Sequence, residues 1–257
     1  MECKRFNSNL DVSGLNKNIK LNKYNGKIYV KVLNIKDSFD NNSPRELFDE
    51  MQIRKMIASN PQLKSFLNKN NIKLKLNMPE LKILMDNHCM DVVNNSSAIA
   101  QNLPSALKQK VNLANLKDGA LLHDFGKVLI PSWILSKPCA LTFDERKIMD
   151  LHGEIGYQLL KTAGINNDVL NLVRYHHTNL APDKNFIPDV NLQILNLADK
   201  YSALTEQRVY KEKYTPRKAL TILYKEVKDG RVHPFLFNAL VKSVINDTVL
   251  KIPEYKK

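Results

Sequence analysis

Hydrophobic side chains recur at helical spacing along most of the chain after residue 78. Between residues 79 and 103 the apolar positions and one histidine return every three, four or seven residues: Leu81, Leu84, Met85, His88, Val92, Ile99 and Leu103. This spacing is typical of one face of an amphipathic helix. His88 shares that face, so we predict that its imidazole points into the protein interior.

The same periodicity predicts a second helix over residues 105–125 and a third that begins at Thr142. Thr142 and Glu145 have the spacing of a capping box, in which both side chains satisfy backbone groups at a helix start. The inward face of this third helix carries another histidine among apolar residues: Ile148, Leu151, His152, Ile155 and Leu159. Two predicted helices therefore place an imidazole inside.

Further helices are expected over residues 168–176, 190–205, 216–227 and 234–245, separated by loops that contain glycine or proline. The pattern as a whole predicts an all-α fold, a helical bundle. Residues 1–40 differ, because they are rich in asparagine and lysine and hold one β-like run at residues 27–33. Ser43, Pro44 and Glu46 then have the pattern of a helix start.

We therefore expect residues 1–75 to be a small N-terminal extension or regulatory subdomain, residues 76–250 to be the helical domain, and residues 251–257 to be a basic tail. A sensor, a dimerisation element and a lid all remain open for the first part, because nothing in its composition chooses among them.

Composition narrows the class of protein. The chain has 257 residues, of which 43% are hydrophobic, but no apolar run approaches the roughly 20 residues of a membrane helix. The start of the chain also lacks the apolar stretch of a signal peptide. We predict a cytoplasmic protein with no membrane partner. Three widely separated cysteines, Cys3, Cys89 and Cys139, are odd in number and predict free thiols rather than disulfides or a thiolate zinc site.

The formal charge of +13 favours an anionic partner. The lysines are spread along the chain without the interleaved aromatic residues of a single-strand binding groove, so a nucleotide fits better than a nucleic acid polymer. The alternative is that lysine and asparagine are simply overused throughout this sequence.

Five of the six histidines and two aspartates form an ordered set within the helical region: His88, His123, Asp124, His152, His176, His177 and Asp199. One histidine on an apolar face is most often a core residue, but the set together favours a buried two-metal site. Asp199 lies in an apolar segment, where a carboxylate without a cation is costly. Mixed imidazole and carboxylate ligands suit iron, manganese or zinc better than calcium or magnesium.

The residues around this set resemble a known family. Residues 121–127 read LLHDFGK, and they are followed by Ile130-Pro131, Lys137-Pro138, Leu141-Thr142, His152, His176-His177 and the segment ADKYSALT at residues 198–205. This sequence is similar to the HD-GYP branch of the HD phosphohydrolase superfamily over roughly residues 80–245. The resemblance implies an HD-domain helical bundle that hydrolyses the second messenger cyclic di-GMP.

By analogy with the family, His88, His123, Asp124 and Asp199 hold one divalent metal ion, and Asp124 bridges to a second held by His152, His176 and His177. Two such ions activate a water and neutralise charge on the phosphoryl oxygens. Lys127 resembles the family lysine that meets a substrate phosphate. Arg208 and Lys211 match a basic pair near the guanylate. We therefore expect Asp124 and Lys127 to be catalytic, and Lys127, Arg208 and Lys211 to bind substrate.

The chain departs from the family pattern at three places. The Gly-Tyr-Pro signature after the histidine pair is absent from residues 178–186, which puts partner contacts through this loop in question. Ser202 stands where many members have an aspartate. Leu84 stands where some members have a glutamate for a third metal. We therefore predict two metal ions, with iron or manganese favoured over zinc, and pGpG as the product.

Two other interpretations remain open. The first is a catalytically silent module that binds a cyclic dinucleotide or a protein. The second is an HD hydrolase that acts on another nucleotide. Activity at saturating metal separates the first from an enzyme, and a substrate panel separates the second. The intact set of seven ligands favours the phosphodiesterase, because a dead site has no reason to keep buried charges.

Overall fold

The computed structural model describes residues 21–24, 27–30, 49–177, 186–207 and 213–250, without the side chains of the two strands or of residues 246–250. The chain divides into two compact units, residues 1–44 and 45–257. In the first, strands β1 (Leu21–Tyr24) and β2 (Lys27–Val30) pair antiparallel with Leu21 opposite Val30. The predicted helix start at residues 43–46 lies outside the described residues.

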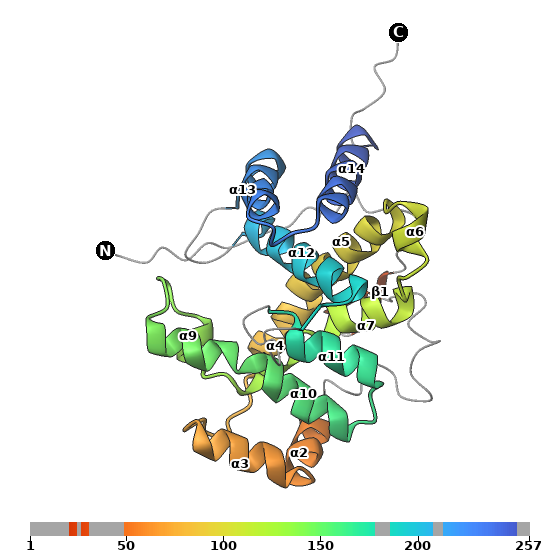
Figure 1. Ribbon diagram of the computed structural model, residues 1–257. Helices are drawn as coiled ribbons and strands as arrows, with labels where there is room; N and C mark the ends of the chain where they lie inside the picture. The colour runs from red at the N-terminus through yellow and green to blue at the C-terminus, as the bar shows by residue number, and fades with distance from the viewer. Residues whose placement is uncertain (1–20, 25–26, 31–48, 178–185, 208–212, 251–257) are drawn as a thin grey trace, which may run out of the picture. The chain divides into compact units, whose positions relative to one another are not determined.

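The described part of the second unit is helical, as Figure 1 shows, and this confirms the predicted all-α fold. Its elements in chain order are α2 (Glu50–Ala58), α3 (Pro61–Lys69), α4 (Met78–Leu84), η1 (Met85–Cys89), α5 (Met90–Gln101), α6 (Ser105–Lys108), α7 (Leu113–Leu122), η2 (Phe125–Leu129), α8 (Ser132–Leu135), α9 (Phe143–Asp150), α10 (His152–Thr162), α11 (Asn167–Tyr175), α12 (Val190–Thr205), α13 (Pro216–Lys228) and α14 (Pro234–Leu250). No helix in this described part combines the length and the hydropathy that crossing a bilayer requires.

Local sequence explains several helix starts. The Thr142 side chain accepts from the Glu145 N–H while the Glu145 carboxylate accepts from the Thr142 N–H, which confirms the predicted capping box. Asp189 caps α12 in a similar way by accepting from the Leu192 N–H. Helix α12 therefore begins and ends at the predicted residues.

Two predicted helices are interrupted, and a third contains an unusual turn. The helix expected over residues 105–125 is divided into α6 and α7, with residues 109–112 in neither helix, and the 3-10 helix η2 begins at Phe125. The helix expected from Thr142 through Leu159 ends at Asp150, and α10 begins at His152 after a single residue, Leu151. The helix expected over residues 79–103 is continuous, but its central turn η1 is a π-helix. A π-turn holds an extra residue and is frequent at functional sites. Here it carries His88.

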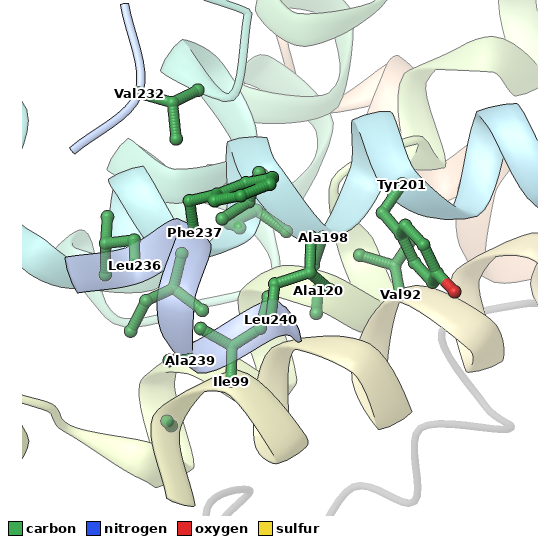
Figure 2. Packing of buried hydrophobic residues seen from close by; sticks show 14 of the residues in the cluster. Val92, Ile99, Ala120, Ala198, Tyr201, Val232, Leu236, Phe237, Ala239 and Leu240 are labelled. Carbon is green, nitrogen blue, oxygen red and sulfur yellow. The ribbon is translucent and has the colours of Figure 1, made fainter. Parts of the chain in front are cut away.

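The main hydrophobic core lies among α5, α7, α12 and α14. Figure 2 shows Val92 and Ile99 of α5 near Ala120 of α7 and Ala198 of α12, with Leu240 of α14 closing the cluster. All five are fully buried. Burying each large aliphatic side chain contributes about 1.5–3 kcal/mol. This packing fixes the helices from which the candidate ligands extend.

A second contact brings η2 against the start of α10. A Cβ atom added to Gly126 would lie 1.9 Å from the His152 carbonyl oxygen and 2.5 Å from the Gly156 nitrogen. Only glycine permits this approach of two backbones. The segment that follows His123 and Asp124 is therefore fixed directly on the turn that presents His152.

Candidate metal centre

The structure brings all seven predicted ligands into one cluster, although they come from separate elements. They are His88 in η1, His123 at the end of α7, Asp124 between α7 and η2, His152 at the start of α10, His176 and His177 after α11, and Asp199 in α12. All are buried except His177, which is half-buried. Their role as metal ligands stays a prediction.

The cluster has two halves. In the acid-containing half, ligand atoms of His88, His123 and Asp199 lie within 4.8 Å of one another, and His88 Nε2 is 3.1 Å from Asp199 Oδ1. In the all-histidine half the same holds for His152, His176 and His177. The Nε2 atoms of His152 and His176 are 3.0 Å apart.

Asp124 lies between the halves and turns one oxygen to each. Its Oδ2 is 3.4 Å from His123 Nε2 and 3.7 Å from His88 Nε2. Its Oδ1 is 3.2 Å from His152 Nε2 and 3.9 Å from His176 Nε2. Each oxygen of this carboxylate therefore faces a different group of histidines.

Backbone carbonyls orient three of the imidazoles. The Nδ1 atoms of His123, His152 and His176 lie 2.7, 2.6 and 2.8 Å from the carbonyl oxygen three residues earlier. Because a carbonyl only accepts, we assign the ring proton to Nδ1, which leaves the Nε2 lone pair facing the cluster. His123 Nε2 is buried and has no hydrogen-bond partner among the described residues. A buried lone pair of this kind fits a metal ion.

Burial and neighbouring charges separate the protonation of the two halves. Burial, together with the proximity of His152, lowers the pKa of His177 to about 4, and burial beside the other imidazoles lowers the pKa of His176 well below its usual range. Burial also lowers the pKa of His88, but contacts with Asp199 and Glu206 outweigh it and raise the pKa to about 9. At neutral pH His176 and His177 are neutral, whereas His88 carries a proton.

Both aspartates remain ionised. Burial raises the pKa of Asp124, but His123, Lys127 and His152 hold it well below its usual range. Burial likewise raises the pKa of Asp199, and its contact with His88 lowers it further than burial raises it. Two ionised carboxylates among five imidazoles form a donor set that fits divalent transition metals.

Of the predicted substrate contacts, the structure describes only Lys127. Its Nζ lies 2.6 Å from Asp124 Oδ2, and 21% of its side chain is exposed, so the ammonium is beside the cluster and within reach of solvent. Arg208, Lys211 and residues 178–185 of the altered loop lie outside the described residues.

Sequence reasoning missed two residues at the cluster. The Cys89 sulfur groups with ligand atoms of His123 and Asp124, and Glu206 Oε2 lies 3.3 Å from His88 Nδ1. The only sequence signal for Cys89 was its position next to His88. Cys89 and Cys139 are free thiols, as predicted. An acid just after the predicted helix 190–205 was the only signal for Glu206.

The positions where the chain departs from the family pattern have their own surroundings. Ser202 accepts a hydrogen bond from Asn95 Nδ2 at 2.8 Å, which joins α12 to α5. Leu84 ends α4, one residue before the π-turn, and supplies no carboxylate to the cluster.

Comparison with known proteins gives several matches. A family model described as HD domain matches residues 85–204. The cyclic di-GMP phosphodiesterase response regulator RpfG of Xanthomonas campestris is 37% identical over 116 residues, which is 41% of this chain and 30% of that protein. The 3'3'-cGAMP-specific phosphodiesterase 1 of Vibrio cholerae is 28% identical over 131 residues, 48% of this chain and 30% of that protein.

A solved structure, the HD domain of the phosphodiesterase PgpH from L. monocytogenes with cyclic-di-AMP, is 19% identical and has a TM-score of 0.48 over 70% of this chain and 99% of that one. The chain spans about a third of the length of the curated relatives it matches.

Proposed function

We propose that the protein is a metal-dependent phosphodiesterase of the HD type that hydrolyses cyclic di-GMP, because residues 85–204 match a family model described as HD domain and relatives with this activity are similar in sequence. The observation that carries the proposal is the position of Asp124, whose two oxygens face two separate groups of ligand atoms. Two cations held side by side are a recurrent device for phosphodiester hydrolysis.

Two divalent ions, with iron or manganese favoured, fit the donors on either side of Asp124. His88, His123, Asp124 and Asp199 would hold one, and Asp124, His152, His176 and His177 the other. When bound, the ions supply Lewis-acid stabilisation of the phosphoryl oxygens and lower the pKa of a water molecule. The protein contributes the fixed imidazole orientations, the bridging carboxylate and the burial that strengthens these interactions.

Lys127 supplies a mobile positive charge at the exposed side of the cluster. Its ammonium contacts Asp124 and is partly exposed, so it is placed to exchange this contact for a substrate phosphate oxygen. Arg208 and Lys211 complete the proposed substrate contacts. The formal charge of +13 favours encounter with a dianionic substrate.

Two metal ions, rather than three, are proposed because Leu84 gives no carboxylate next to His88. We accordingly propose pGpG as the product. Contact with a protein partner through residues 178–186 stays a separate prediction.

A second substrate is favoured by a specific match. The chain is similar in sequence to a 3'3'-cGAMP-specific phosphodiesterase. This similarity makes 3'3'-cGAMP, a cyclic dinucleotide with one different base, a second candidate substrate for the same hydrolysis. The buried cluster meets the phosphodiester, which both dinucleotides share.

The test is turnover by the purified protein with manganese or with anaerobic ferrous iron, on cyclic di-GMP and 3'3'-cGAMP in parallel, with the products separated over time. Formation of pGpG that is lost in Asp124→Ala supports the proposal. Preferred cleavage of 3'3'-cGAMP selects the second substrate. Tight dinucleotide binding without turnover, at full metal loading, contradicts an enzyme and favours a binding module.

A further inference from the structure

His88 is held differently from three other imidazoles of the cluster. His123, His152 and His176 each direct Nδ1 at the carbonyl three residues earlier. Among the described residues, no group forms a hydrogen bond of regular geometry with His88 Nδ1. The residue lies in the π-turn η1, where the backbone is wound differently, and its Nδ1 instead contacts a carboxylate oxygen of Glu206 at 3.3 Å.

Glu206 occupies a position that helix electrostatics disfavours. It is the C-cap of α12, with its N–H donating to the Ser202 carbonyl at 2.9 Å. The C-terminal end of a helix carries partial negative charge, so a carboxylate there is unfavourable. A second acid is also close, because burial and then the charge of Glu206 raise the pKa of Asp91. A positive charge near Glu206 stabilises its carboxylate at this position.

His88 supplies such a charge on the inward side of Glu206. The Glu206 side chain is 25% exposed, while that of His88 is 3% exposed, so the carboxylate reaches from the edge of the fold to a buried ring. The contact uses Nδ1, the atom on the opposite side of the ring from Asp199 and Asp124, which both face Nε2. Glu206 thus does not compete for the ligand atom.

We propose that Glu206 is a positioning residue that holds the His88 ring, with its proton on Nδ1, so that Nε2 faces the metal of the acid-containing half. This inference rests on the proposed metal site. A carboxylate behind a ligand imidazole fixes its orientation and increases its basicity. His123, His152 and His176 have neutral carbonyls in this place, so among these four histidines His88 is the one whose orientation depends on a charged group.

The expected effect is confined to one metal ion. Loss of a carboxylate of this kind typically weakens metal binding about 10–100-fold. We expect Glu206→Gln, which keeps size and one acceptor but removes the charge, to weaken one of two metal equivalents by about 10-fold, and Glu206→Ala to approach 100-fold. The equivalent in the all-histidine half keeps its affinity.

The experiment is a calorimetric titration of the metal-free full chain with Mn²⁺, for wild type, both Glu206 variants and Glu226→Gln. Glu226 pairs with Lys200 at 2.6 Å between α12 and α13, so this control removes the same charge from another carboxylate that contacts α12. It should titrate as wild type. Turnover of cyclic di-GMP is measured on the same samples at saturating Mn²⁺, where Glu206→Gln should recover most of its kcat.

Weakening of one equivalent in the Glu206 variants alone supports the inference. Unchanged titration of both variants overturns it, and so does equal weakening of both equivalents, which indicates a general structural role. If the wild type binds two equivalents of Mn²⁺ but shows no turnover, the proposed phosphodiesterase activity is contradicted. The comparison of metal binding between wild type and the Glu206 variants still tests the role of Glu206 in that case.

Discussion

The two halves of the cluster differ in how the surroundings shift the pKa values of their histidines. The acid-containing half sets His88 and His123 against Asp199, and it keeps a proton on His88 because the pKa of that ring is raised to about 9. The all-histidine half has three imidazoles, two of which have lowered pKa values. Within one buried cluster, the neighbours of a histidine therefore decide whether it is charged, and burial alone does not.

The difference has a consequence for metal binding. A cation that enters the all-histidine half meets the neutral imidazoles of His176 and His177, whereas one that enters the acid-containing half must displace the proton of His88. In return, that half offers the negative charge of Asp199. Asp124 contacts histidines of both halves, so its removal should weaken metal binding in both.

The largest effect is therefore expected for Asp124→Ala. Without the shared carboxylate neither half retains its full ligand set, so turnover should fall roughly a thousandfold or more and metal content should drop below two equivalents. Rates at saturating Mn²⁺ and metal analysis of the dialysed protein measure both. Asp144→Ala, at an exposed carboxylate that contacts only Lys147 among its charged neighbours in α9, serves as the control. Full activity of Asp124→Ala would contradict the proposed role of Asp124 as a ligand shared by two metal ions.

Next in size are the two single-ligand variants that separate the halves. His88→Ala should lose one metal equivalent from the acid-containing half, and His177→Ala should lose one from the all-histidine half, each with at least about 100-fold weaker binding. Titration with Mn²⁺ shows which step disappears, and each variant controls the other. Loss of the same step in both variants would contradict a division into two halves.

The pH dependence of the metal-free protein tests the opposite charges. The folded pKa of His88 is raised, so its contribution to the free energy of unfolding is present below about pH 6.5 and lost as pH rises to about 9. The folded pKa of His177 is lowered, so its contribution is present above about pH 6.5 and lost as pH falls to about 4. Each amounts to a change on the order of 3 kcal/mol.

Urea unfolding in EDTA between pH 4 and 9 provides the measurement. We expect His88→Gln to flatten the alkaline side of the profile and His177→Gln to flatten the acid side. Identical profiles for the two variants would show that the halves do not differ in charge.

The smallest effect on the cluster itself is expected for Lys127→Ala. The variant should retain both metal ions, because Lys127 donates no ligand atom, and should bind Mn²⁺ as well as or better than wild type once the cation beside Asp124 is gone. The KM for cyclic di-GMP should rise about 10–100-fold through loss of a charge-assisted contact. Lys137→Ala removes a lysine of equal exposure, paired with Glu145, and should change neither quantity. Metal loss in Lys127→Ala would contradict the assigned role.

Much of the fold was predictable because helix starts and apolar periods are local. Thr142 and Glu145 identify their helix start by direct contact, and α12 could be delimited from its own residues. The π-turn around His88 was not, since apolar spacings of three, four and seven are compatible with both windings. The interruption at Leu151 escaped for the same reason.

The seven ligands were found because their order matched a known pattern, and the structure gathers them, while their binding of metal is still to be measured. Glu206 escaped detection because its importance comes from a contact with a residue far away in the sequence. An acidic residue that follows a helix can face solvent or contact a buried imidazole, as Glu206 does. The neighbouring sequence does not distinguish these two cases. Side-chain pairs of this kind depend on tertiary packing, which periodicity does not report.

The close approach of Gly126 to the His152 carbonyl has a practical meaning for protein design. Anyone who transplants this cluster into another helical scaffold would have to carry over the backbone crossing together with the ligands. A scaffold that separates the two segments by even the width of a methyl group would hold Asp124 away from His152. The smallest portable unit is therefore a pair of crossed backbones with their side chains attached.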